Sequence, residues 1–185
     1  MTQASLHALL ERIGNLLRER ARSIATSEGL KLAQLDALVY LSRANRYSDT
    51  TSAVVDYLGA TKGSVSQTLT ALERKDLVER VPDEVDGRVS HCRLTRRGRQ
   101  VAREAFPSDL LEGPDRPQLE RELVTLLGDI QQSRGGRGFG VCRTCVHFTR
   151  VGQGHRCGLT GEPLTLPESR LLCREHEPPM LGENG

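Results

Sequence analysis

The middle of the chain contains two short helical segments, each preceded by a threonine. Thr50 or Thr51 can cap a helix over residues 52–58 by accepting a backbone hydrogen bond. In the same way, Thr61 can cap a helix over residues 63–75. About three residues separate the two helices, which is the turn length of a helix-turn-helix. The sequence therefore predicts a helix-turn-helix here.

A strand pair follows these two helices. Apolar and polar residues alternate over residues 77–81, the chain turns through residues 82–87, and it returns over residues 89–94. Thr95 can cap a further helix, which Pro107 would stop. The predicted fold class is mainly α with a β-hairpin wing, that is, a winged helix-turn-helix.

Amphipathic segments lie on both sides of this centre. Apolar residues recur at three- and four-residue steps over residues 6–24, 30–44 and 119–130, which is the spacing of one helical face. The first and last of these segments can pack their apolar faces on the body of the domain or on a second subunit.

Positive charge is concentrated in the middle of the chain. The formal net charge is only +2, but the segment from Lys62 to Arg103 holds ten Lys and Arg against six Asp and Glu. No stretch approaches the roughly 20 apolar residues that span a bilayer. Charged residues interrupt the N-terminal segment before a signal-type apolar run develops. We therefore expect a cytoplasmic protein with no membrane partner.

The second helix of a helix-turn-helix enters the major groove of double-stranded DNA, so its exposed face needs short polar side chains. Gln67 is the best candidate for reading a base, through a bidentate contact to adenine. Lys62, Arg74 and Lys75 are expected at phosphates. Arg88, at the hairpin tip, is expected in the minor groove. The predicted DNA-binding residues are Lys62, Ser64, Ser66, Gln67, Thr70, Arg74 and Arg88.

Three short motifs carry a family resemblance: LERKDLV at residues 72–78, DGR at 86–88 and LTRRG at 94–98. With them, the sequence over residues 30–105 resembles the MarR family of winged-helix transcription regulators. The resemblance implies sequence-specific DNA binding. It also implies an obligate homodimer on a pseudo-palindromic operator, with the N- and C-terminal helices interlocked at the dimer interface.

Two features depart from that family. Its penultimate helix is usually long and continuous, whereas this region contains Pro107, Gly113, Pro114 and Pro117. A connection without regular helix is therefore expected through Pro117. The family also has no standard counterpart to residues 141–185.

The C-terminal part contains a cluster of cysteines. A reducing cytosol disfavours disulfides, so clustered cysteines indicate metal binding or thiol chemistry. Ligand bonds would also replace the hydrophobic core that this segment, with few apolar side chains, lacks. The predicted metal ligands are Cys142, Cys145, Cys157 and Cys173. The remaining Cys92, in the returning strand, is interpreted as a small buried hydrophobe.

The spacing of these cysteines does not by itself identify the metal. A zinc ribbon normally has two Cys-x2-Cys pairs, whereas only the first pair is close here. With Phe148 behind the first pair and Pro178 behind the last cysteine, the segment is similar to small four-iron four-sulfur (4Fe-4S) segments of the high-potential type. We favour an iron-sulfur cluster. Zinc, with a nitrogen ligand from His155 or His176, and a metal-free thiol switch are the alternatives.

An iron-sulfur cluster would explain sensing, because it changes oxidation state or falls apart under oxygen, nitric oxide or iron shortage. The hypothesis is that the cluster sets operator affinity through the last amphipathic helix. The alternative is a MarR-like regulator with structural zinc and a small-molecule or protein signal. The sequence has no phosphate loop, nucleophile elbow or zinc-protease motif, so we do not expect an enzyme.

The length of 185 residues allows one full domain and a small appendage. Residues 1–133 are predicted to form the winged-helix and dimerisation domain, and residues 141–180 the metal-binding segment. The sequence RGGRGFG at residues 134–140 is expected to be a flexible linker between them.

Overall fold

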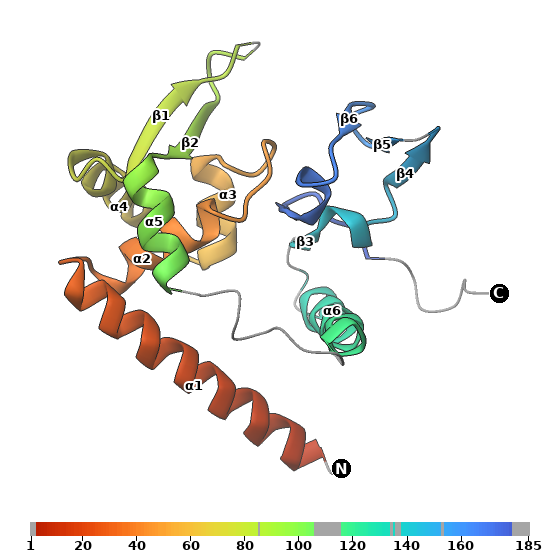
Figure 1. Ribbon diagram of the computed structural model, residues 1–185, viewed down its shortest axis with the longest axis horizontal. Helices are drawn as coiled ribbons and strands as arrows, with labels where there is room; N and C mark the ends of the chain where they lie inside the picture. Colours follow the sequence, from red (N-terminus) through yellow and green to blue (C-terminus); the bar gives the residue numbers. More distant parts are fainter. Residues whose placement is uncertain are drawn as a thin grey trace.

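The computed structural model of the protein describes residues 3–84, 86–105, 116–133, 135, 138–152 and 154–178. Figure 1 shows a body of helices with a hairpin, a smaller body of strands beside it, and a long first helix that extends away. The helices are α1 (Gln3–Ser27), α2 (Leu32–Leu41), α3 (Thr51–Leu58), α4 (Lys62–Arg74), α5 (Arg96–Ala105) and α6 (Arg116–Ser133). The strands are β1 (Val78–Pro82), β2 (Ser90–Leu94), β3 (Gly140–Val141), β4 (Phe148–Val151), β5 (Gly154–Cys157), β6 (Pro163–Leu164) and β7 (Leu172–Cys173).

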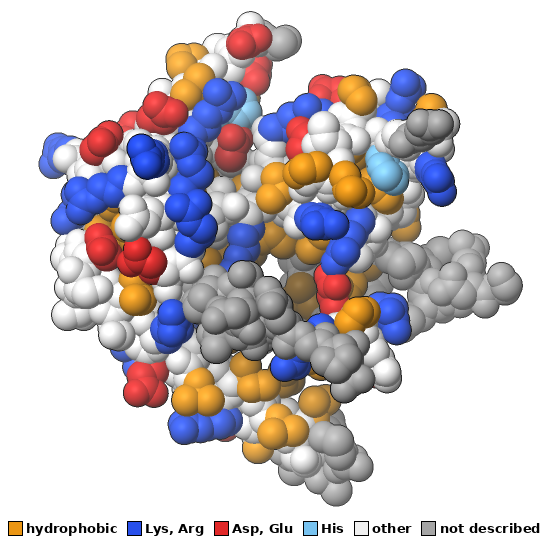
Figure 2. All heavy atoms as spheres, viewed as in Figure 1, with side chains coloured by type: hydrophobic (Ala, Val, Ile, Leu, Met, Phe, Trp, Pro, Cys, Tyr) orange, Lys and Arg blue, Asp and Glu red, His pale blue; other side chains and the backbone are white. Residues whose placement is uncertain are grey.

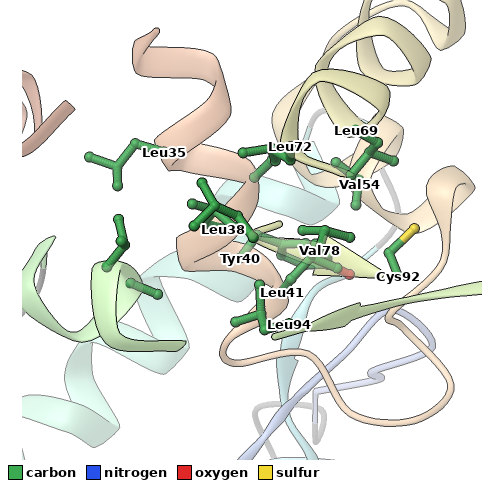
Figure 3. Packing of buried hydrophobic residues seen from close by; sticks show 14 of the residues in the cluster. Leu35, Leu38, Tyr40, Leu41, Val54, Leu69, Leu72, Val78, Cys92 and Leu94 are labelled. Atoms are coloured by element: carbon green, nitrogen blue, oxygen red, sulfur yellow. The ribbon is translucent and has the colours of Figure 1, made fainter. Parts of the chain in front are cut away.

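The hydrophobic core of the winged helix is built around α2. Leu35 and Leu38 of α2 are fully buried, as are Leu69 and Leu72 on one face of α4. Figure 3 shows side chains from α2, α3, α4 and both hairpin strands meeting in one cluster. Full burial of a leucine stabilises a fold by about 1.5–3 kcal/mol, so this cluster holds α4 and the hairpin in place.

Local capping explains where the two helices of the helix-turn-helix begin. The Thr50 hydroxyl accepts a hydrogen bond from Ala53 N, and the Thr61 hydroxyl accepts one from Ser64 N, each at 3.3 Å. Gly59 ends α3 with a φ of 60°, a left-handed conformation that glycine adopts without a Cβ clash. The predicted helix-turn-helix is confirmed.

The predicted hairpin is also confirmed. Strands β1 and β2 are antiparallel, with Val78 opposite Leu94. The chain then enters α5, where the Thr95 hydroxyl accepts a hydrogen bond from Gly98 N at 3.1 Å. The described part of the chain is therefore mainly helical, with a winged helix and small antiparallel sheets.

Helices α1 and α6 expose apolar faces. Only the C-terminal end of α1 joins the core, where Ala25 is buried, whereas Ile13 on the same helix is 52% exposed. Helix α6 has no buried residue. Both predicted amphipathic helices are present, and within one chain neither buries its whole apolar stripe.

One expectation about the connection before α6 is wrong. Pro117 does not lie in an irregular segment but in the first turn of α6, which begins at Arg116. Proline is accepted in a first turn because the backbone N–H there has no partner within the helix. Pro107, Gly113 and Pro114 lie outside the described residues.

The cysteine segment forms two small sheets, β3–β7 and β4–β5–β6, with two 3-10 helices, η2 (Cys142–Thr144) and η3 (Glu168–Arg170). It packs on the loop between α2 and α3, where Leu172 N donates to Arg43 O at 2.7 Å and Asn45 N donates to Leu172 O at 2.9 Å. The segment thus pairs with the backbone of the winged helix.

The end of the expected flexible linker is packed as well. Phe139 is 8% exposed, and its ring lies 5.2 Å from that of Tyr57 and 6.0 Å from that of Tyr40. Gly140 is buried and starts β3. The last two linker residues are therefore ordered by burial, and the proposed division of the chain stays a prediction.

None of the helices in the described part of the chain is long and apolar enough to cross a membrane.

Candidate DNA interface and thiol site

The polar face of α4 lies in solvent. Val65, Leu69 and Leu72 are buried at three- and four-residue steps, which turns the polar positions of the helix outward. Figure 2 shows Lys and Arg side chains spread over the side of the molecule that carries α4, α5 and the wing. Of the predicted DNA-binding residues, α4 exposes Lys62, Ser64, Ser66, Gln67 and Arg74, and partly exposes Thr70.

The seventh predicted DNA-binding residue, Arg88, is exposed near the tip of the wing. The Asp86 carboxylate accepts a hydrogen bond from Arg88 N at 3.0 Å, and Asp83 accepts one from Asp86 N at 2.7 Å. Such side-chain to backbone bonds order a turn. They hold the wing tip while leaving the Arg88 guanidinium accessible, and the DNA contacts of all seven residues stay a prediction.

His91 on β2 joins the wing to the loop between α2 and α3. Its Nδ1 lies 2.5 Å from a carboxylate oxygen of Asp49 in that loop, and its Nε2 lies 3.0 Å from Asp83. These two hydrogen bonds raise the pKa of His91, and the bond to Asp49 has the larger effect. Sequence reasoning missed this group. The hairpin turn could have indicated Asp83, but Asp49 is 42 residues away in sequence.

All four predicted metal ligands border one cavity of about 40 Å³. A single water needs about 10–15 Å³, so this space is large enough for an ion. The cysteines in its lining are Cys142, Cys145, Cys157 and Cys173, and the other lining residues include Tyr47, His147, Phe148, Leu159 and Leu164. The four cysteines therefore line the same cavity, and their role as metal ligands stays a prediction.

Hydrogen-bond donors point at these sulfurs. Asn45 Nδ2 donates to Cys142 Sγ at 3.2 Å, and Glu177 N donates to Cys145 Sγ at 3.4 Å. The Cys142 thiol donates to Cys173, which lowers the pKa of Cys173 and raises the pKa of Cys142, whose burial raises it further. Donors of this kind stabilise the thiolate form that metals bind.

The sulfurs border a cavity but do not surround one point. Among the residues that the structure describes, no three Cys, His, Asp or Glu side chains form a group that could hold a metal ion as they stand. A tetrahedral zinc site needs each sulfur about 2.3 Å from the metal. Binding would therefore require the four side chains to converge. The donor set fits a thiolate-ligated metal and does not choose between zinc and iron.

The three histidines of the segment differ in position. His147 lines the cavity. The His155 ring stacks on that of Phe148 at 4.7 Å, and His176 is 6% exposed with its Nε2 2.9 Å from the Thr144 hydroxyl. His155 and His176, the residues considered as nitrogen ligands for zinc, are thus engaged in packing and hydrogen bonding.

Cys92 lies apart from this site. It is 1% exposed within the main core, where Figure 3 shows it beside the other buried side chains. Burial raises the pKa of its thiol. Its position is that of a small buried hydrophobe, as expected.

A helix-turn-helix with a polar second helix, followed by a hairpin, defines a winged-helix DNA-binding fold. Residues 28–89 match the sequence model of the MarR family. This part of the chain is therefore similar to the winged helix of MarR-family transcription regulators. No curated protein matches the chain.

Solved structures share this fold. A MarR-family transcriptional regulator from Silicibacter pomeroyi is 26% identical, with a TM-score of 0.54 over 66% of this chain and 87% of that chain. A point mutant of MepR from a multidrug-resistant S. aureus clinical isolate is 25% identical, with a TM-score of 0.50 over 70% and 88%. CouR from Rhodococcus jostii RHA1, bound to p-coumaroyl-CoA, is 20% identical with a TM-score of 0.51 over 67% and 90%, which shows the fold alone.

Proposed function

We propose that the protein is a dimeric transcription regulator whose binding to operator DNA depends on a metal centre held by the four cysteines of its C-terminal segment. The observation that carries this proposal is the shared cavity of four thiols, packed directly on the MarR-type winged helix. Such a regulator acts on chromosomal DNA, and we propose the cytoplasm as its location.

The exposed face of α4 supports major-groove reading by a helix-turn-helix. Gln67 and its polar neighbours would contact bases, Lys62 and Arg74 phosphates, and Arg88 the minor groove. The exposed stripes of α1 and α6 support a homodimer, and a two-fold dimer requires a pseudo-palindromic operator.

We favour an iron-sulfur cluster, of the 4Fe-4S type, over zinc. Cys142, Cys145, Cys157 and Cys173 would hold either group. A cluster would supply redox, oxygen or iron sensing, because its oxidation or loss changes the bonds that hold this segment together. Structural zinc would leave the signal to a small molecule or a protein.

The first experiment measures metal content, sulfide and visible absorbance after purification without oxygen. Iron, sulfide and a broad band near about 400 nm are expected from a cysteine-ligated cluster. Cys145→Ser should lose them, whereas Cys92→Ser, which changes a core cysteine, should keep them. Stoichiometric zinc in a colourless protein would establish the alternative, and metal-free protein with reactive thiols would overturn both.

A second experiment tests the DNA interface with an operator selected from random duplexes. Arg88→Ala and Gln67→Ala should each weaken specific binding by about 1–3 kcal/mol, which is roughly tenfold to a hundredfold, with the dimer intact. Arg150→Ala is the matched control, since Arg150 is exposed on the cysteine segment. If the Arg88 variant binds as tightly as the control, the wing does not contact DNA.

A further inference from the structure

The loop between α2 and α3, residues 42–50, has the cysteine segment on one side and the wing on the other. Ala44 of this loop forms a parallel bridge with Leu172, the residue before Cys173. Thr50, at the other end of the loop, forms an antiparallel bridge with His91 of β2. The same nine-residue stretch therefore contacts both the thiol site and the wing.

Two buried polar residues of the loop form hydrogen bonds with the cysteine segment. Asn45 is 1% exposed, and its amide nitrogen donates to Cys142 Sγ while its amide oxygen accepts from Tyr47 N at 3.1 Å. Ser48 is fully buried, and its hydroxyl accepts a hydrogen bond from Arg174 N, the residue after Cys173, at 2.9 Å. Buried polar groups need such partners, so these bonds tie the loop to the cysteine segment.

The opposite end of the loop is hydrogen-bonded to strand β2 of the wing. Asp49 O accepts a hydrogen bond from Cys92 N at 2.6 Å, and the Asp49 carboxylate contacts His91 at 2.5 Å. Thr50, the next residue, caps α3. A shift of the loop at Asn45 or Ser48 would therefore move a strand of the wing and the start of the helix-turn-helix.

Helix α6 is attached to the cysteine segment more weakly than the α2–α3 loop is. It touches the cysteine segment through the Gln131 side chain, which bonds the backbone of Phe139, and through an ion pair between Glu120 and Arg143. The charged pair is exposed, with each side chain more than 40% accessible, and α6 has no buried residue. Exposed pairs of this kind contribute little to coupling.

We propose that the α2–α3 loop is part of the thiol site, with Asn45 and Ser48 as positioning residues for the sulfurs, and that it carries the state of the site to the wing. This inference rests on the proposed metal-binding function. When the four side chains converge on a metal, Asn45 would donate to the bound Cys142 thiolate, and Ser48 would hold the backbone directly after Cys173. Loss of the metal returns the sulfurs to neutral thiols, which accept hydrogen bonds more weakly than thiolates, so it would loosen the loop and with it strand β2.

The test titrates Co²⁺ into reduced, metal-free full-length protein and follows thiolate-to-cobalt charge-transfer absorbance. Asn45→Asp keeps the side-chain size and the oxygen that accepts from Tyr47, but replaces the donor to Cys142 with a carboxylate oxygen. Loss of such an outer partner weakens metal binding by about 10–100-fold. We therefore expect Asn45→Asp to bind Co²⁺ about 10–100-fold more weakly than wild type and to have a shifted charge-transfer band. Asn15→Asp, the same change at an exposed site on α1, should bind Co²⁺ like wild type.

Hydrogen exchange in the same samples tests the route. In wild type, Co²⁺ should slow amide hydrogen exchange in peptides that cover residues 42–50 and 90–94. Residues 90–94 are included because Cys92 N donates a hydrogen bond to Asp49 O of the loop. Asn45→Asp should lose this slowing over residues 90–94. A Gly-Ser insertion after Gly135, which lengthens the connection to α6, should keep it. Ser48→Ala is a second variant with the same expected direction, should circular dichroism show that Asn45→Asp does not fold.

The outcomes separate the two proposals. Wild type that binds no Co²⁺ through thiolates overturns the metal-binding function, and this inference with it. Wild type that binds Co²⁺ while both loop variants bind it equally well and keep the slowing at residues 90–94 overturns only the inference. Loss of the slowing on insertion after Gly135 alone would assign the coupling to α6 instead.

Discussion

Gly98 lies where α5 packs on the end of the loop before β1. A Cβ atom at this position would lie 2.0 Å from Leu77 O, a distance that real contacts do not reach. The same carbonyl oxygen accepts a hydrogen bond from Thr95 N at 3.1 Å, so it is not free to move away. The glycine of the LTRRG motif is therefore required by close packing.

Gly98→Ala should destabilise the protein by at least about 1–3 kcal/mol, the cost of forcing an extra carbon into a packed site. Gly63→Ala is the matched control, because Gly63 is an exposed helical glycine with no atom within 4 Å of an added Cβ. That change should be neutral or stabilise the protein by up to about 1 kcal/mol. Urea unfolding of both variants measures the difference, and equal stabilities would show that α5 can shift.

Among the contacts between the wing and the α2–α3 loop, the one made by His91 depends on pH. The hydrogen bonds of His91 to Asp49 and Asp83 raise its pKa in the folded protein. The folded state then holds the proton more tightly than the unfolded chain does, so the protonated pair stabilises the fold. This stabilisation is fully present below about pH 6.5, the ordinary pKa of histidine, and is lost as pH rises through the raised value.

Thermal unfolding should therefore show a melting temperature that falls between about pH 6 and about pH 9, the range above the ordinary histidine pKa. His91→Gln, which cannot carry the charge, should have a lower melting temperature at the acidic end and a flatter profile. His7→Gln, on the exposed face of α1, serves as the control and should keep the wild-type slope. An unchanged slope in the His91 variant would mean that other groups produce the pH dependence.

Helices α1 and α6 leave most of their apolar side chains exposed when the chain is considered as a monomer. Figure 2 shows hydrophobic side chains along the lower part of the molecule, where α1 lies. The exposed apolar residues of the two flanking helices are Leu6, Leu9, Leu10, Ile13, Leu16 and Leu17 of α1, and Leu119, Leu123, Leu127 and Ile130 of α6. Such contiguous apolar surface marks a protein interface, which is the basis of the proposed dimer.

Ile13→Glu should weaken that dimer. Each copy would lose about 1.5–3 kcal/mol of apolar burial, so the two copies together should raise the dissociation constant by at least about a hundredfold. Val151→Glu is a control with nearly equal exposure, 51% against 52%, on the cysteine segment. Sedimentation equilibrium measures both, and a wild-type dissociation constant in the Ile13 variant would exclude α1 from the interface.

Local sequence signals are enough to predict the helices and strands of the winged helix. Thr50, Thr61 and Thr95 start helices through bonds to residues three positions further on, and apolar periodicity selects the buried face of α4. These signals act within a few residues, so they can be read without the fold. Pro117 shows their limit, because proline breaks a helix interior but begins a helix equally well.

No local sequence signal predicts how the cysteine segment packs on the winged helix. Asn45 and Cys142 are 97 residues apart, and His91 and Asp49 are 42 apart, so neither contact has a local signal. The cysteine spacing suggested that the four thiols could share one site, but it gave no sign that Asn45, in a loop of the winged helix, would contact Cys142. Contacts between distant segments depend on how whole faces pack together, and that packing is set by the burial of the entire chain.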